Sequence, residues 1–121
     1  TSGTNSGAAY IFERDANGNW GTAVSGQTYR YENKMLKASN AGAGAHERFS
    51  NSVSIDGTYA IVGAYYEDSI QETGANSGAA YIFERDTNGN WNETQLFKSS
   101  NPYWNDRFGR SVSIGGDYAI I

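Results

Sequence analysis

The chain of 121 residues has no cysteine, a single proline and no long apolar segment. Without cysteine it cannot form disulfide bridges, thiolate metal sites or a cysteine nucleophile. No apolar run approaches the roughly 20 residues that cross a bilayer, so we expect no membrane insertion. Helix-forming periodicity is also scarce, which disfavours a helical fold.

The sequence also lacks a cluster of positive charge. Its net charge is −4 and its nine basic residues are scattered along the chain. A basic patch is the usual footprint of a nucleic-acid binder, so we expect no nucleic-acid partner. Fifteen glycines separate short runs rich in Tyr, Ile, Val, Phe and Thr, which are typical of strands. The composition therefore predicts an all-β protein.

Two segments occur twice in the chain. The segment NSGAAYIFERDANGNW at 5–20 returns at 76–91 with one difference, and RFSNSVSIDGTYAIV at 48–62 matches RFGRSVSIGGDYAII at 107–121. The first pair is offset by 71 residues and the second by 59, so the first copy has 12 extra residues, most of them at 21–30. Such self-similarity indicates a repeat architecture.

Each repeat contains four strand patterns. Residues 52–55 alternate polar and apolar, and the run at 59–65 is apolar on successive residues, which is typical of an inner strand. Residues 78–85 form a third pattern, and Asn88-Gly89 supplies a tight turn before a fourth strand at 91–97. A sheet of four antiparallel strands with two apolar faces needs neighbours on both sides. Radial stacking of such sheets predicts a β-propeller.

The segments Phe-Ser-Asn-Ser-Val at 49–53 and Val-Gly-Ala-Tyr at 62–65 resemble FG-GAP repeats, particularly those of bacterial type. The second copy contains the Phe-Gly pair itself at 108–109, whereas Ser50 replaces the usual Gly and Tyr65 the usual Pro. The resemblance covers nearly all of the chain outside residues 21–30. It implies a seven-bladed propeller like the integrin α-subunit head, which acts without catalysis in extracellular or cell-surface recognition and adhesion.

In the integrin head, calcium loops join the two strands that correspond here to 52–55 and 59–65. The connection in this chain is only three residues long, too short to surround an ion that takes six to eight oxygen ligands. That site is therefore not expected here, and we predict no cofactor.

Three other loops keep calcium as an alternative: Asp15–Asn19, Asp86–Asn90 and Glu67–Glu72. The first two place oxygen side chains at alternate positions, as a calcium loop does, but neither has an acidic residue at the twelfth position. We therefore favour Asn-Gly turns stabilised by their aspartates. For Glu67, Asp68 and Glu72, solvated loop charge is the default interpretation.

The repeat divides the chain into residues 1–47, the second half of a repeat with the insertion, residues 48–106, a complete repeat, and residues 107–121, the first hairpin of the next. By this alignment the chain begins and ends inside a blade. Three arrangements stay open: an excerpt of a longer chain, a ring of several copies, or a fibre in which half blades pair between copies. A ring of identical copies would have an even number of blades.

No catalytic constellation is evident, so we expect that the protein is not an enzyme. His46 is the only histidine, and the second copy reads Asn-Asp-Arg-Phe where the first reads His-Glu-Arg-Phe. This replacement favours a structural loop position for His46 over a general base.

Aromatic residues fall into two groups. Those that recur in the repeat are predicted to lie mostly between blades: Tyr10, Phe12, Trp20, Tyr59, Tyr81, Phe83, Trp91 and Tyr118. Those that do not recur lie in connecting segments and are the candidate contacts for a protein or glycan partner: Tyr29, Tyr31, Tyr103 and Trp104.

Overall fold

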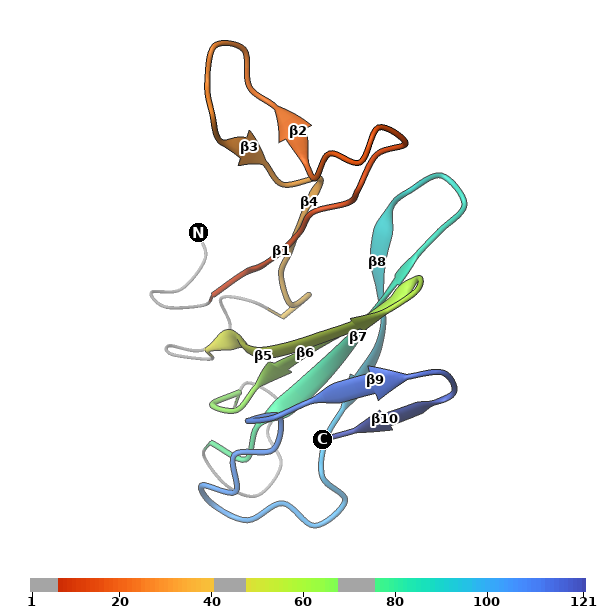
Figure 1. Cartoon of the computed structure of the whole chain (residues 1–121). Coiled ribbons are helices and arrows are strands. Elements are labelled where there is room, and N and C mark those ends of the chain that lie inside the picture. The colour runs from red at the N-terminus through yellow and green to blue at the C-terminus, as the bar shows by residue number, and fades with distance from the viewer. Residues whose placement is uncertain (1–6, 41–47, 68–75) are drawn as a thin grey trace.

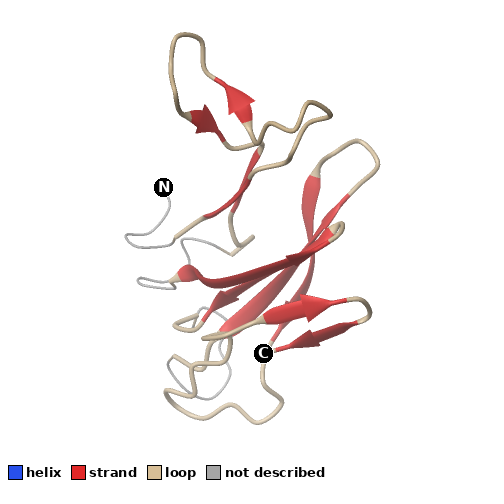
Figure 2. Ribbon diagram, viewed as in Figure 1, coloured by secondary structure: helices blue, strands red, loops and turns tan. Residues whose placement is uncertain are grey.

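The computed structural model describes residues 7–40, 48–67 and 76–121, and in that part of the chain it contains strands and turns without a helix (Figure 2). The prediction of an all-β fold is confirmed. No helix that could cross a membrane is present among these residues. The strands are β1 (Ala9–Ile11), β2 (Thr22–Ala23), β3 (Arg30–Tyr31), β4 (Lys34–Leu36), β5 (Phe49–Asp56), β6 (Tyr59–Ala64), β7 (Ala79–Arg85), β8 (Trp91–Phe97), β9 (Ser113–Gly115) and β10 (Tyr118–Ile120).

A four-stranded antiparallel sheet occupies the centre of the molecule, with its strands in the order β5-β6-β7-β8. Its register places Ile61 opposite both Ser54 and Ile82. This sheet is the complete blade that the sequence predicts. It begins slightly earlier than expected, at Phe49, and its second strand ends at Ala64, so that Tyr65 lies in the following turn.

The central blade has an apolar core on each face because its inner strands alternate their side chains between the two faces. One face, with Val62 and Tyr81, packs against Ile11 and Leu36 of the amino-terminal segment. On the other face, a cluster that includes Ile61 packs against the carboxy-terminal segment. In Figure 1 the β1–β4 pair, the central sheet and the β9–β10 hairpin follow one another as successive layers. These layers are the stacking of propeller blades, without a closed ring in the described part of the chain.

The amino-terminal pair β1–β4 is a half blade with the register of the central blade. Ala9 lies opposite Leu36, as Ala80 lies opposite Phe97. An isolated bridge between Arg14 and Trp20 likewise repeats the pairing of β7 with β8. The segment from Trp20 to Leu36 is ten residues longer than its counterpart, and the additional residues form the β2–β3 hairpin. The insertion thus interrupts the outer strand of this half blade.

The carboxy-terminal hairpin β9–β10 repeats β5–β6 and is tied to the central blade through polar groups of β5. The Ser52 hydroxyl donates to the Gly109 carbonyl at 2.8 Å, and the Ile114 amide donates to the Ser54 hydroxyl oxygen at 3.2 Å. The polar face of β5 is therefore directed at the next blade, which accounts for its alternating sequence.

The expectation that the recurring aromatic residues lie mostly between blades is wrong for the chain as described. Tyr81, Phe83 and Trp91 are buried in the central blade, but their first-copy counterparts are exposed because none of the described residues forms a blade on that side of them. The exposed members of the recurring set are Tyr10, Phe12, Trp20, Tyr59 and Tyr118.

Candidate functional site

The β2–β3 hairpin extends away from the central blade (Figure 1) and is fixed at its base by the guanidinium of Arg30. The Nε atom of Arg30 donates to the Trp20 carbonyl, and Nη2 donates to the Gly21 carbonyl at 3.0 Å. Between β3 and β4, Oδ1 of Asn33 accepts the Glu13 amide at 2.6 Å. These bonds connect the base of the hairpin to the half blade below it.

Two of the four predicted contact residues lie together on this hairpin. The rings of Tyr29 and Tyr31 are 5.9 Å apart at an interplanar angle of 53°, and the residues are 52% and 56% exposed. A pair of exposed tyrosine rings offers apolar faces and hydroxyl groups to a partner, and such groups are enriched in binding surfaces.

The other two predicted contact residues, Tyr103 and Trp104, lie in the segment between β8 and β9. They are 67% and 71% exposed, and a turn is formed there by the Tyr103 amide, which donates to the Asp106 carboxylate at 2.7 Å. This segment and the β2–β3 hairpin lie at opposite ends of the molecule in Figure 1. The structure therefore brings together Tyr29 and Tyr31 but does not join them to the second pair.

Two of the three candidate calcium loops are turns that use their aspartates internally. Oδ1 of Asp15 accepts the amides of Asn17 and Asn19 at 2.9 and 2.8 Å, and Asp86 does the same in the second copy. The amide of Asn19 is the main reason that the pKa of Asp15 is lowered. In the described part of the chain, no group of three or more His, Cys, Asp or Glu residues could hold a metal ion.

The third candidate loop is described only at Glu67, because Asp68 and Glu72 lie outside the described residues, as does His46. Glu67 is not a solvated charge: it is fully buried, its carboxylate is paired with the ammonium group of Lys98, and it accepts from the Asn40 amide group at 3.1 Å. Loss of a partner from such a buried pair is costly, so these contacts hold Glu67 in one position after β6.

A polar contact between the first half blade and the central blade centres on Glu13. Its carboxylate accepts from both Arg85 nitrogens, Nε at 2.8 Å and Nη2 at 3.1 Å, and from the indole nitrogen of Trp91 at 3.0 Å. These bonds lower the pKa of Glu13, with the Arg85 bond as the largest cause. The sequence shows Arg85 and Trp91 as repeated positions but gives no sign that one glutamate joins them.

A further cluster that the sequence analysis missed surrounds Tyr66. The guanidinium carbon of Arg48 lies 4.7 Å from the Tyr66 ring centre and that of Arg107 lies 5.7 Å from it. Arg48 also donates to the Tyr65 hydroxyl at 2.6 Å. The two arginines occupy the same position in successive repeats, and this repetition was the sequence signal from which the cluster could have been found. Their contacts with the tyrosine rings join one repeat to the next.

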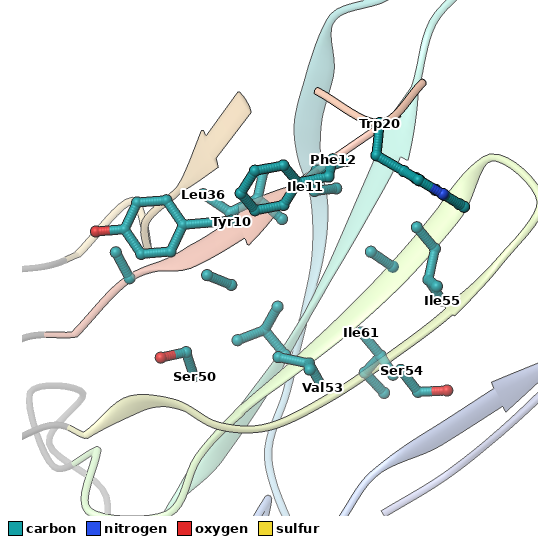
Figure 3. Close-up of a pocket in the computed structure, with 14 residues that line it drawn as sticks. Tyr10, Ile11, Phe12, Trp20, Leu36, Ser50, Val53, Ser54, Ile55 and Ile61 are labelled. Atoms are coloured by element: carbon teal, nitrogen blue, oxygen red, sulfur yellow. The ribbon is translucent and has the colours of Figure 1, made fainter. Parts of the chain in front are cut away.

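An apolar groove of about 590 Å³ lies between the first half blade and the central blade. Figure 3 shows Tyr10 and Phe12 on one side of it and Val53 and Ile55 on the other. Val53 and Ile55 are 59% and 58% exposed, although both belong to β5 of the central blade. The sequence analysis did not predict this groove.

The Phe-Gly and Gly-Ala segments of successive repeats are in close contact. Gly109 follows Phe108, and its backbone oxygen approaches the Cα of Gly63 so closely that a β-carbon there would be 1.9 Å away. The Phe-Gly of one repeat therefore packs on the Gly-Ala of the repeat before it. Ser50, which replaces glycine in the first copy, has a φ of 73°, a left-handed conformation that glycine adopts more readily.

Comparison with known proteins gives one family. Residues 32–83 match the model of the FG-GAP repeat, from just before β4 to Phe83 in β7. No curated protein matches the chain. The division at residues 48 and 106 stays a prediction, because the match crosses the first of these boundaries and ends before the second. The chain therefore carries a match to the FG-GAP repeat that spans β4 and the first three strands of the four-stranded sheet.

Proposed function

We propose that this chain is a non-catalytic recognition segment of a β-propeller that acts outside the cell or on its surface, and that its β2–β3 hairpin contacts a protein or glycan partner. The observation that carries this proposal is the exposed pair of rings at Tyr29 and Tyr31 on a hairpin anchored to the blade.

The repeat supports this proposal because aromatic residues present in both copies belong to the blade scaffold, whereas those present in one copy only are additional to it. Where the second copy runs directly from Trp91 into a continuous outer strand, the first copy interrupts that strand with ten residues. Blade folding does not need these residues, since the central blade forms without them. A protruding insertion on a repeated scaffold is a common place for binding residues.

Binding of the whole chain to a printed array of neutral and acidic glycans and to intact cells tests this function. The Tyr29→Ala/Tyr31→Ala variant should lose binding about tenfold, as truncation of aromatic anchors does, with an unchanged melting temperature. The Tyr118→Ala variant, which removes a tyrosine that is 83% exposed and lies outside the hairpin, is the matched control and should bind as the wild type. Unchanged binding by the first variant, or cleavage of an arrayed glycan, would contradict the proposal.

A second function is favoured by the free edge of β1 beside the apolar groove. In the described part of the chain β1 pairs only with β4, whereas its counterpart β7 pairs on both sides. Unpaired strand edges favour association with further strands. We therefore propose, as the alternative, that copies of the chain assemble by completing one another's half blades. Light scattering over a range of concentrations tests this, and a monomer at every concentration would contradict it.

A further inference from the structure

We propose that the free edge of β1 and its groove receive the β9–β10 hairpin of a second copy, and that Glu84 of this second copy binds Arg14 and Trp20. This inference rests on the second proposed function, assembly between copies. It specifies the segment that docks, the register of its strand pairing and the charged contact that makes this docking specific.

The repeat identifies the strands that would complete the half blade. In the central blade the β5–β6 hairpin lies beside β7, which is the counterpart of β1. The β9–β10 hairpin repeats β5–β6: its pairing of Tyr118 with Gly115 corresponds to that of Tyr59 with Asp56. It therefore has the sequence and the strand pairing of the hairpin that lies beside β7.

The register follows from the central blade. There β6 pairs with β7 with Ile61 opposite Ile82. Placing β10 of a second copy beside β1 in the same register sets its Ile120 opposite Ile11. The side chain of Ile61 is fully buried, whereas Ile120 is 72% exposed in its own copy. Docking would move Ile120 from water into the apolar environment of its counterpart.

The groove has the lining that this hairpin needs. On the other face of the central blade, Ile114 of β9 packs against the cluster that contains Ile61. Ile55 is the counterpart of Ile114 in β5, and it lines the groove while 58% exposed. A hairpin in the groove would cover Ile55 in the way that the central blade covers Ile114. Burial of apolar area of this kind is the main favourable contribution to association.

The charged contact repeats a contact that is present within the chain. Glu13 of the half blade binds Arg85 and Trp91 of the next blade. One repeat earlier, the positions of Arg85 and Trp91 are occupied by Arg14 and Trp20.

Among the residues that the structure describes, neither group has the corresponding partner. Arg14 makes no ion pair in the described part of the chain, and Trp20 is 57% exposed whereas Trp91 is 5% exposed. The counterpart of Glu13 is Glu84, in the central blade. A second copy docked through its β9–β10 hairpin places its central blade next to this half blade, and thus Glu84 next to Arg14.

The interface joins different surfaces of the two copies, so each copy has one donor end and one acceptor end. Repetition of such a contact gives a ring if the rotation closes and a filament if it does not. Two blades are contributed per copy in either case.

Charge reversal followed by mixing tests the inference in the 121-residue chain. Glu84→Arg alone places two cations at the interface, and Arg14→Glu alone places two carboxylates there. Each variant should assemble about tenfold or more weakly than the wild type in sedimentation velocity, because like charges in contact are unfavourable. An equimolar mixture should restore association at least to pairs of unlike variants, since positions 84 and 14 of unlike variants carry opposite charges. Lys34→Glu, a reversal of an exposed charge on β4, is the matched control and should assemble as the wild type.

The outcomes separate this inference from the function on which it rests. If the wild type is monomeric at every concentration, assembly itself fails and the inference fails with it. If the wild type assembles but both single variants assemble equally well, copies associate through another surface and only the inference is overturned. If both variants are folded monomers, by circular dichroism, and their mixture stays monomeric, the contact between Glu84 and Arg14 is also overturned.

Discussion

The backbone oxygen of Gly109 lies against the Cα of Gly63, so that a β-carbon on Gly63 would stand 1.9 Å from it. The two residues belong to successive repeats, and their contact brings the backbones of two blades together. No side chain larger than hydrogen fits between them. Glycine at position 63 is therefore required by the spacing of the blades rather than by a turn.

Replacing Gly63 by alanine should lower the free energy of unfolding by about 2 to 3 kcal/mol, because a methyl group forced against fixed backbone overpacks the interface. Urea unfolding followed by tryptophan fluorescence measures the change. Gly115→Ala is the control, since a β-carbon at Gly115 meets nothing within 4 Å, and it should change stability by less than about 0.5 kcal/mol. Equal stability of the two variants would show that the blades can move apart.

The central blade could be predicted from sequence because its information is local and repeated. Strand patterns from 52 to 97 fix four strands, and the second copy confirms where each begins. The site was harder to predict. The β2–β3 hairpin lies inside a strand that the repeat presents as continuous, and residues 21–30 carry no alternation that would reveal it.

Contacts between blades were not predictable for a different reason. The carboxylate of Glu13 reaches Arg85 across 72 positions of the sequence, and no local pattern relates the two. The burial of Glu67 is similar, because its partners Asn40 and Lys98 lie 27 and 31 positions away along the sequence. From the sequence alone, acidic residues in a loop are interpreted as solvated charges. Only the folded structure shows that a cation lies beside one of them.

Glu13→Gln should lower the free energy of unfolding by about 0.5 to 1 kcal/mol at neutral pH, since the Glu13 and Arg85 side chains are about one-third exposed and solvent weakens their attraction. The pKa of Glu13 is lowered from its ordinary value of 4.5 in the folded state. Its contribution is therefore complete above pH 4.5 and is lost as the pH falls through the folded-state pKa.

Thermal unfolding of Glu13→Gln and the wild type at a series of pH values measures this pH-dependent contribution to stability. The difference in melting temperature should be constant near neutrality and should shrink toward zero in acid. Glu32→Gln, which removes a carboxylate that takes part in neither ion pair found in the described part of the chain, is the control. A difference that grows as the pH falls would contradict the assignment.

Calcium should not stabilise the Asp15–Asn19 and Asp86–Asn90 turns. Each aspartate already accepts two backbone amides, whereas calcium takes six to eight oxygen ligands. Asp86→Ala should lower the melting temperature equally in millimolar calcium and in chelator. A rise in the wild-type melting temperature with calcium that disappears in Asp86→Asn would instead assign a calcium site to this turn.

Replacement of Lys98 by methionine should be strongly destabilising, because it removes a cation that is paired with the fully buried carboxylate of Glu67. Removal of one partner from a buried ion pair lowers the free energy of unfolding by about 3 kcal/mol or more.

The repeat supplies a matched control in Lys37→Met, which alters the same position of the first copy, where the lysine is exposed. That variant should unfold in urea as the wild type does. The double variant Glu67→Gln/Lys98→Met should recover part of the loss, since it also removes the buried negative charge. A single variant Lys98→Met as stable as Lys37→Met would contradict a stabilising role for the pair of Glu67 and Lys98.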